Sequence, residues 1–512
     1  MDGPHRILLA MTDGIGWARR DRVVLGAIVA AAALSLVWLV HPWFEASNDA
    51  AMYVACAQSM LAGEGYTFLD EPFRVRPPGF PALLVPMLAW RGLDVPALNF
   101  YVAAWGVACV ALVFVWARTR VSTWVALAIA AILWFNPGFA SLRNQLMSDV
   151  PGTALLFACL LLERWCARQP SFRRDVVLGV ALGLSTYVRS IVLVLAIGIV
   201  LARVFGARSA GRPVLRTVGS RVVPLLLVFA AVQAPWKVRD VLHRPLPPVT
   251  QTSLYDYSTG MWHTDRGDPS SPRVPVTDVL ERIPHHAENV IVAIGSRLRG
   301  SEPNVANVIL GGLFLLALAV QAARKRESAE LFGCGAILLV VPYFSFQDRL
   351  LLPVLIVAWT STAQLLEELG RRWHASRGGF VPLLPACAML AIDFHPRANW
   401  EEVRIAHETC ARWAERVKPL LPEGERVAVP MEGWRWTIWL QRPVWTLFFG
   451  WNRGPGPRGA EDVLARHSID LVLVTPFTAS DAAMRPWLLS RYVVLHDEPD
   501  LALVRVRSRV GR

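Results

Sequence analysis

Charge is what this sequence of 512 residues has least of. Asp, Glu, Lys and Arg make up 18% of the chain and hydrophobic residues 54%, whereas an average soluble domain has about 25% charged residues. The deficit is concentrated in long uncharged runs such as VVLGAIVAAAALSLVWLV at 23–40. Because a helix needs roughly 20 apolar residues to cross a bilayer, these runs predict membrane-spanning helices. The composition excludes an ordinary soluble protein.

Several other features are absent. No small-x-small cleavage site follows the first apolar run, which exceeds the roughly 7 to 15 residues of a signal sequence, so we expect it to stay in the mature chain. The seven cysteines show neither a disulfide ladder nor a zinc spacing, and we expect no structural disulfide and no cysteine metal site. Only three of the 52 basic residues are lysine, which suggests a GC-rich bacterial genome.

Apolar runs bounded by Arg, Pro or Gly predict about eleven spans. They lie near residues 23–42, 97–117, 123–139, 150–166, 176–188, 190–206, 222–236, 304–323, 331–346, 350–368 and 380–394. With a cytoplasmic N-terminus, the inside segments hold 21 Arg or Lys residues and the short outside segments six. This bias accounts for the net charge of +12 without nucleic acid, and it predicts a bacterial inner (plasma) membrane protein with its C-terminus outside.

The chain divides into three parts on this topology. We expect a cytoplasmic tail at 1–22, a transmembrane module at 23–394 with outer loops 43–96 and 237–303, and a periplasmic α/β domain at 395–512. The first loop predicts two short helices at the membrane interface, and the second a helix that runs from Thr277 to Ile283 and resumes at His286. The C-terminal part predicts an amphipathic helix at 399–417 and short strands in RVAVP, IDLVLV, YVVLH and LALVRV.

Two carboxylates stand at span ends in an almost uncharged module. Asp49 follows the first span and Asp149, in NQLMSDVP, lies between the third and fourth, so the topology puts both on the outer face. An ionised Asp can accept a proton from an attacking hydroxyl, which makes the pair candidate catalytic residues. The alternative is that each only caps the helix that follows it.

Four arginines stand on the same outer face, against the positive-inside trend: Arg76, Arg189, Arg239 and Arg349. A guanidinium binds phosphate through two parallel hydrogen bonds, so these residues are candidates for an anion site. The alternative is that each extends its side chain toward lipid headgroups.

Six motifs occur in an order that resembles the bacterial C-type (GT-C) membrane glycosyltransferases, which include protein O-mannosyltransferases and lipid A aminoarabinose transferases. They are SNDAAMYVACAQSMLAGEGY, RPPGFPALL, MSDVP, GVALGLSTYVRS, PWKVRD and QDRLLLPVL, and they cover the chain to about residue 395. The resemblance implies a fold of many transmembrane helices and transfer of a sugar from a polyprenyl-phosphate donor to a glycan, lipid or protein acceptor.

The resemblance also implies roles for individual residues. Asp49 would be the catalytic base, Asp149 the acidic residue of the second outer loop, and Arg76 the contact to the donor phosphate. Tyr53, in the first motif, is placed with the substrate-binding residues. Some family members have Glu where this chain has Val75, and Glu71 is the nearest substitute for a metal or acceptor contact.

The implied reaction is a direct displacement at the anomeric carbon. Because a lipid phosphate leaves readily at neutral pH, the site needs a base and cations but no general acid. Its partners would be the polyprenyl-phosphate sugar, a periplasmic acceptor and membrane lipids. We expect no cofactor: His285, His286 and Glu288 form the nearest approach to a metal cluster, and they are better interpreted as a solvated helix face.

Two features leave alternatives open. Five tryptophans fall in the 18 residues 434–451 and are explained by anchoring to the bilayer, by core packing or by sugar stacking. A transporter or flippase of lipid-linked sugars is the main alternative function. Such proteins usually show internal repeats or ionisable residues near the bilayer midplane, and this sequence shows neither. A scaffold for the C-terminal domain would leave the two large outer loops unexplained.

Overall fold

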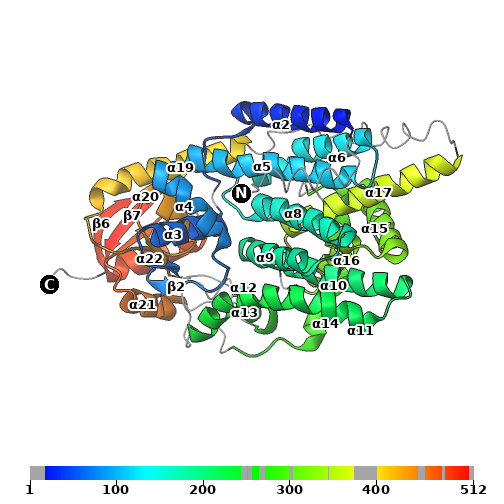
Figure 1. Ribbon diagram of the computed structural model, residues 1–512. Helices are drawn as coiled ribbons and strands as arrows, with labels where there is room; N and C mark the ends of the chain where they lie inside the picture. Colours follow the sequence, from blue (N-terminus) through cyan, green and yellow to red (C-terminus); the bar gives the residue numbers. More distant parts are fainter. Residues whose placement is uncertain are drawn as a thin grey trace.

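The computed structural model describes residues 18–45, 47–243, 251, 256–264, 271–298, 304–343, 345–373, 400–447, 456–475 and 479–506. These residues form a bundle of long helices and, at one end of it, a smaller region of short strands and helices near the C-terminus (Figure 1). The predicted fold class, a polytopic helical membrane protein with a small C-terminal α/β region, is confirmed.

The bundle is made of long apolar helices and a few short ones. Its members are α2 (Arg19–Leu39), α5 (Val95–Arg118), α6 (Thr123–Phe135), α7 (Pro137–Arg143), α8 (Asp149–Arg168), α9 (Phe172–Val188), α10 (Val192–Ser209), α11 (Val214–Thr217), the π-helical turn η1 (Val218–Val222), α12 (Val223–Leu242), α15 (Val305–Lys325), α16 (Ser328–Val340), the 3₁₀ turn η3 (Asp348–Leu351) and α17 (Leu352–Trp373). Within the described residues, seven helices are long and apolar enough to span a membrane, or eight if α6 and α7 form one bent span. The chain is a multi-pass membrane protein.

The predicted spans correspond to these helices, with two differences and one gap. The predicted span 123–139 is broken into α6 and α7, which meet at an angle of 61°. The break follows from the sequence, because the Asn136 side chain caps α7 by accepting a hydrogen bond from Phe139 N at 2.8 Å and Pro137 takes the first helical position. Helices α9 and α16 have 17 and 13 residues and are shorter than a typical span. The predicted span 380–394 lies outside the described residues.

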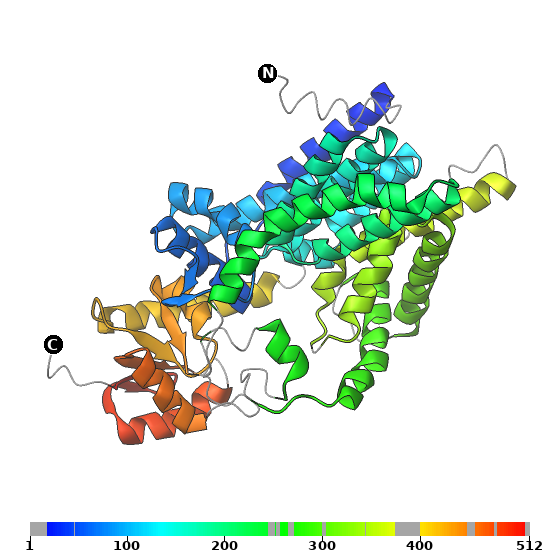
Figure 2. The same cartoon turned by 60° about the horizontal axis from the view of Figure 1, so that its bottom comes forward.

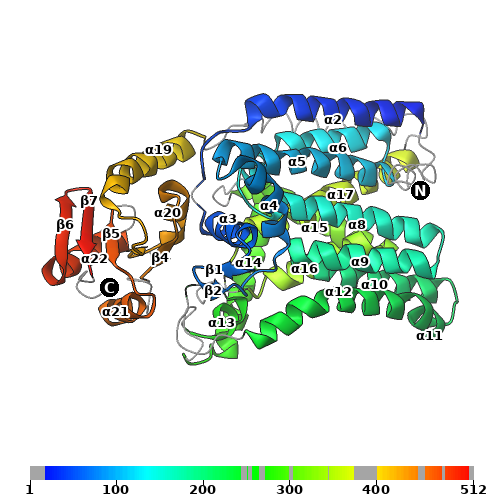
Figure 3. The same cartoon turned by 60° about the vertical axis from the view of Figure 1, so that its left-hand side comes forward.

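The first outer loop contains the two short helices that the sequence predicts. They are α3 (Asn48–Leu61) and α4 (Gly79–Arg91), joined through the short hairpin of β1 (Thr67–Phe68) and β2 (Glu71–Pro72). α3 packs against α4 on one side and against α20 (Gly433–Leu440) of the C-terminal region on another, as Figure 3 also shows. This loop therefore joins the bundle to the C-terminal region.

The second outer loop contains α13 (Tyr257–Trp262) and α14 (Val276–Gly295). The predicted interruption of the second helix near Pro284 is wrong, because α14 runs through that residue without a break. α14 is held along α15 by very close backbone contact, since a Cβ at Gly295 would lie 1.8 Å from the Asn307 carbonyl oxygen. Packing over the whole length of the helix outweighs the hydrogen bond that one proline removes.

The C-terminal region is a small α/β unit built on a mixed five-stranded sheet. Its elements are α19 (Trp400–Val417), the 3₁₀ turn η4 (Lys418–Leu420), β3 (Val427–Val429), α20, β4 (Val444–Thr446), α21 (Gly456–Arg466), β5 (Leu471–Val474), α22 (Ala479–Arg491), β6 (Val493–Glu498) and β7 (Leu501–Arg505). The strand order is β4-β3-β5-β7-β6, with parallel pairs around β3 and antiparallel pairs around β7. The four predicted strands are present as β3, β5, β6 and β7, and β4 was not predicted.

Buried side chains form two separate cores. One lies among the bundle helices, and the other combines α3 and α4 with the C-terminal sheet, so the C-terminal region shares its core with the first outer loop. Figure 2 shows this region, in orange and red, at one end of the bundle.

The tryptophan cluster belongs to the second core. Trp434, Trp436, Trp439 and Trp445 are between 1% and 6% exposed. Bilayer anchoring is therefore wrong for these four, and core packing, the alternative, is confirmed. Trp451 lies outside the described residues.

Candidate active site

Asp49 lies in the first turn of α3 and forms ion pairs with two arginines. Its Oδ1 accepts a hydrogen bond from Arg76 Nη2 at 2.5 Å, and its Oδ2 accepts one from Arg349 Nη2 at 2.6 Å. The N-cap position is held by Ser47. The alternative that Asp49 only caps the helix is therefore wrong, and both of its oxygens are directed at cations.

Asp149 occupies a matching position as the first residue of α8, with Ser148 at the N-cap position. Its side chain is 1% exposed and lies 2.7 Å from Arg189 Nη2 and 4.0 Å from Arg349 Nη1. The contact with Arg189 is a close ion pair whose geometry departs from that of a directional hydrogen bond. Capping is the wrong interpretation for this carboxylate as well.

Arg349 joins the two carboxylates into one network, which we call the Arg–Asp network. It runs through five residues in alternating charge: Arg76, Asp49, Arg349, Asp149 and Arg189. The structure thus brings together both predicted catalytic residues and three of the four predicted arginines, from segments that are up to 300 residues apart. Three guanidinium groups against two carboxylates leave a net positive charge for an anionic ligand.

Two glycines permit this convergence. A Cβ at Gly79, three residues after Arg76, would lie 2.5 Å from the Tyr187 backbone, so only glycine lets α4 approach the end of α9. A Cβ at Gly152 would lie 2.7 Å from Arg189 Cβ and 2.8 Å from its Cδ. Gly152 therefore leaves the space through which Arg189 reaches Asp149.

The arginines determine the protonation of Asp49. Burial raises the pKa of this carboxyl, but the charges of Arg76 and Arg349 outweigh burial and lower the pKa to about 2. Asp49 is consequently ionised at neutral pH. A carboxylate stabilised this strongly is a weak base for as long as both guanidinium groups remain on it.

Two residues of the predicted motifs, Gln347 and Tyr53, contact the network or a residue next to it. Gln347 Oε1 accepts hydrogen bonds from Arg349 Nε at 3.0 Å and from Nη2 at 2.8 Å, and so fixes the direction of its guanidinium. The Tyr53 hydroxyl lies 3.4 Å from Ser148 Oγ, and its ring packs edge-on against Phe80. Tyr53 therefore touches the network through the residue next to Asp149. Gln347 was not among the predicted site residues, although it stands in the QDRLLLPVL motif.

Arg239 lies apart from the network. Its guanidinium donates to the carbonyl oxygens of Phe73 at 2.7 Å and Tyr66 at 2.5 Å, and it stacks on Tyr66 and Trp236. The Tyr66 hydroxyl in turn donates to the backbone oxygen of Arg76 at 3.1 Å. Arg239 thus holds the loop that carries Arg76, two contacts away from the charges.

Glu71 also lies apart, at the contact between the first outer loop and the C-terminal region. Its carboxylate accepts a hydrogen bond from Gln251 N at 3.1 Å and lies 3.6 Å from His467 Nε2. Burial raises the pKa of Glu71 to about 7 and lowers the pKa of His467 to about 4. A proton at this pair therefore resides on Glu71.

The C-terminal region reaches the residue next to Asp49. Asn48 Oδ1 accepts a hydrogen bond from Arg435 Nε at 3.0 Å, and Arg435 forms an ion pair with Glu432 at 2.8 Å. Glu432 has a left-handed backbone (φ 55°) at the start of α20, a conformation that costs a non-glycine residue about 1 kcal/mol or more. No sequence pattern indicated this contact, because it depends on how two distant segments pack.

Within the residues that the structure describes, no group of three His, Cys, Asp or Glu side chains could hold a metal ion. His286, which the sequence analysis assigned to a solvated face, is 7% exposed and lies with Nδ1 3.0 Å from the Val341 carbonyl oxygen. That interpretation is wrong for His286, because α14 turns this residue toward the end of α16.

No protein-family model and no curated protein sequence matches the chain. Solved structures do. ArnT from Cupriavidus metallidurans bound to undecaprenyl phosphate is 14% identical over 96% of this chain and 99% of its own, with a TM-score of 0.63. ArnT in the apo state is 13% identical over 94% of this chain and 97% of its own, with a TM-score of 0.61. The archaeal oligosaccharyltransferase AglB from Archaeoglobus fulgidus, in complex with an inhibitory peptide and a dolichol-phosphate, is 14% identical over 93% of this chain and 73% of its own, with a TM-score of 0.56. At these identities the likeness shows the fold, and the fold that the sequence resemblance implies is confirmed.

Proposed function

We propose that this protein is a membrane glycosyltransferase that moves a sugar from a polyprenyl-phosphate donor to an acceptor on the outer, periplasmic face. The observation that carries the proposal is the Arg–Asp network, in which three guanidinium groups and two carboxylates meet at one end of the bundle. The fold supports it, because a structure of the same fold was solved with undecaprenyl phosphate bound.

The network supplies what the displacement requires. As the bond from the anomeric carbon to the phosphate oxygen breaks, negative charge develops on the departing lipid phosphate, and Arg76 and Arg349 can stabilise it. As the acceptor oxygen attacks, its proton must leave, and we assign the role of proton acceptor to Asp49. Asp149 holds Arg349 and Arg189 in position and keeps their charges balanced when no donor is bound.

Donor binding would also activate the base. A donor phosphate competes with Asp49 for the guanidinium groups of Arg76 and Arg349, and every hydrogen bond that shifts to the phosphate leaves the carboxylate. Burial then dominates and raises the pKa of Asp49. The carboxylate thus becomes a useful base only when the donor is in place, which limits wasteful deprotonation of water or acceptor in the empty site.

The remaining predicted site residues receive supporting roles in this proposal. Tyr53 steadies the segment that carries Asp149, and Arg239 steadies the loop that carries Arg76. Glu71 faces the C-terminal region and is proposed as an acceptor contact. The sugar transferred and the acceptor, whether glycan, lipid or protein, are to be identified by analysis of the accumulated donor in a deletion strain.

We further propose that the protein lies in the inner membrane with its N-terminus in the cytoplasm, on the ratio of 21 inside to six outside basic residues. A reporter fused after Arg377 should then be cytoplasmic and one fused after Arg512 periplasmic. Reporters on the same side would contradict this topology.

The test of the function is transfer of labelled sugar from polyprenyl phosphate in proteoliposomes by Asp49→Asn. The change keeps the size of the side chain but removes the proton acceptor, so turnover should fall by about 10² to 10⁴. Donor affinity should be unchanged or higher, because the phosphate no longer competes with a carboxylate for Arg76 and Arg349.

The matched control is Asp94→Asn, which replaces another helix-start aspartate that is paired with an arginine. Asn also caps a helix well, so this variant should retain the wild-type rate. A folded Asp49→Asn protein within about threefold of the wild-type rate would remove Asp49 as the base, since loss of a general base costs far more.

A further inference from the structure

A charged pocket lies at the opposite end of the bundle from the Arg–Asp network. It has a volume of about 810 Å³ and is formed by the ends of α5, α8, α10 and α15 and the start of α16. α8 connects the two places, since it begins at Asp149 and ends at Arg168. At 1.5 Å per residue its 20 residues separate them by roughly 30 Å, about the thickness of the bilayer core.

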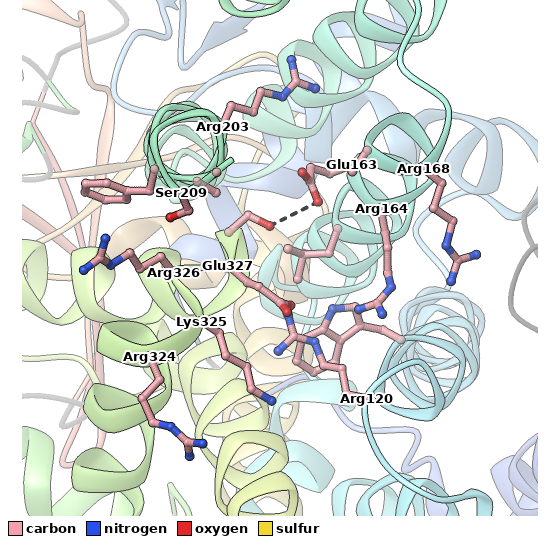
Figure 4. A pocket seen from close by; sticks show the side chains of 17 residues that line it. Arg120, Glu163, Arg164, Arg168, Arg203, Ser209, Arg324, Lys325, Arg326 and Glu327 are labelled. Atoms are coloured by element: carbon pink, nitrogen blue, oxygen red, sulfur yellow. Dashed lines mark hydrogen bonds and ion pairs between the residues drawn. The ribbon is translucent and has the colours of Figure 1, made fainter. Parts of the chain in front are cut away.

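Seven cations line this pocket against two carboxylates, Glu163 and Glu327. The cations are Arg120, Arg164, Arg168, Arg203, Arg324, Lys325 and Arg326. They come from four separate elements and surround one space, as Figure 4 shows. Such a surplus of positive charge around a concave surface attracts anions.

Four of these cations already have carboxylate partners. Arg120 forms ion pairs with Glu327 at 2.6 Å and with Glu330. Arg203 pairs with Asp175 at 2.9 Å, and Arg324 and Lys325 both pair with Glu368, at 3.1 and 2.7 Å. These pairs hold the walls of the pocket together and contribute little net charge.

Three arginines remain without an ion pair among the described residues: Arg164, Arg168 and Arg326. Among the residues that the structure describes, Arg164 donates only to the Thr119 carbonyl oxygen, from Nη2 at 3.0 Å. The Arg326 guanidinium rests on the ring of Phe205, 5.4 Å from its centroid, and its left-handed backbone (φ 53°) closes the turn between α15 and α16. These three guanidinium groups are therefore available to a ligand.

We propose that this pocket binds the phosphate group of an anionic ligand, with Arg164, Arg168 and Arg326 as its principal contacts. Guanidinium groups favour phosphate because each can donate two parallel hydrogen bonds to its oxygens. The helix ends around the pocket lie where a transmembrane bundle meets the headgroup layer, so a phospholipid headgroup and a soluble phosphate compound are the two sources of this chemistry.

The test compares the triple variant Arg164→Gln, Arg168→Gln, Arg326→Gln with a control of equal charge. The control is Arg208→Gln, Arg212→Gln, Arg216→Gln, because these arginines are exposed at the same end of the bundle, on and after α10, and do not line the pocket. Both variants lose three positive charges from one face, so a general effect of surface charge would lower binding equally in the two.

Binding is measured on the purified full chain in uncharged detergent, by native mass spectrometry and by thermal shift. The probes are phosphatidylglycerol, phosphatidylcholine as the lipid of no net charge, and inorganic phosphate and pyrophosphate at constant ionic strength. We expect the pocket variant to bind its probe about tenfold or more weakly and the control to bind like wild type, since each lost charged hydrogen bond is worth more than a neutral one.

Selective loss of phosphatidylglycerol binding identifies a headgroup site, and selective loss of phosphate or pyrophosphate binding identifies a site for a soluble compound. Equal losses in both variants, or no loss in the pocket variant, overturn the proposal. A third variant with Lys at the same three positions covers the case in which the Gln variant does not fold. It keeps the positive charges but not the guanidinium fork, so it should bind the anionic probes with intermediate affinity. If the wild-type protein binds only phosphatidylcholine, the lipid of no net charge, the proposal is also refuted.

Discussion

Gly152→Ala displaces Arg189 without changing a single charge, and it therefore tests whether the geometry of the Arg–Asp network matters for turnover. The new Cβ would lie 2.7 Å from Arg189 Cβ and 2.8 Å from its Cδ. Carbon atoms prefer separations of about 3.5 to 4.0 Å, so the side chain must move by roughly 1 Å. Its guanidinium then leaves the position 2.7 Å from Asp149.

The expected loss of activity exceeds the expected loss of stability. A misplacement of about 1 Å in a catalytic arrangement can cost about 10²-fold in rate. The added methyl group costs about 1 to 3 kcal/mol as overpacking, and the higher helix propensity of alanine returns about 0.5 to 1 kcal/mol of this. Turnover of labelled donor should fall by about two orders of magnitude, while the melting temperature changes by only a few degrees.

Two further variants test whether the effect of Gly152→Ala arises from its contact with Arg189. Gly312→Ala adds the same methyl group inside α15, where nothing lies within 4 Å of the new Cβ, and should leave the rate unchanged. In an Arg189→Gly background both clashing carbon atoms, Cβ and Cδ, are absent, so adding Gly152→Ala should cost nothing more. A Gly152→Ala enzyme within about threefold of wild type, or costs that simply add in the double variant, would refute the claim that Gly152 acts through Arg189.

Two other changes test the contacts of the C-terminal region. Arg435→Ala removes the hydrogen bond to Asn48. We expect about tenfold lower turnover, since misplaced catalytic groups reduce the rate steeply, and faster hydrogen exchange in α3. The control is Arg404→Ala, which breaks an exposed ion pair with Glu401. The pKa of Glu71 is about 7 in the folded protein, above the roughly 4.3 of a free glutamate, so the folded state holds this proton more tightly and loses stability as pH rises from 5 to 8. Glu71→Gln should remove about 1 to 3 kcal/mol of that loss, and an unchanged difference in melting temperature between pH 5 and pH 8 would contradict it.

The sequence was sufficient to identify most of the network because topology constrains it. Asp49, Arg76, Asp149, Arg189 and Arg349 all stand at ends of apolar runs, and alternation of the runs puts those ends on one face. Few charged residues stand at such ends, so the number of candidate site residues is small. Which arginine pairs with which carboxylate was not predictable, because those distances depend on the packing of α4 against α9 and of α8 beside Arg189.

Arg239 and Glu71 show where sequence reasoning stops. Arg239 was predicted on the same face as the network, yet from α12 it donates to the backbone oxygens of Tyr66 and Phe73, on either side of the β1–β2 hairpin. Glu71 follows Arg239 in lying apart, because its place on β2 directs it toward Gln251 and toward His467 of the C-terminal region. The prediction that the tryptophans anchor the chain to the bilayer was wrong for a related reason. An aromatic-rich segment suits a bilayer interface and a protein core equally well, and only the shared core of α3, α4 and the sheet decides between them.

If donor binding releases Asp49 from its arginines, the two kinetic parameters should respond differently to pH. The parameter kcat/KM reports the free enzyme, in which the pKa of Asp49 is about 2, so it should stay flat down to about pH 4. The parameter kcat reports the donor complex, in which burial raises the pKa of Asp49. As pH is lowered, kcat should therefore decrease with an apparent pKa above about 4, because a protonated Asp49 cannot act as the base. Because burial also raises the pKa of Glu45 to about 7, both profiles are measured in a Glu45→Gln background. Acid limbs of kcat and kcat/KM that coincide would mean that the arginines stay on Asp49 throughout the reaction, and the proposed exchange with the donor phosphate would then be wrong.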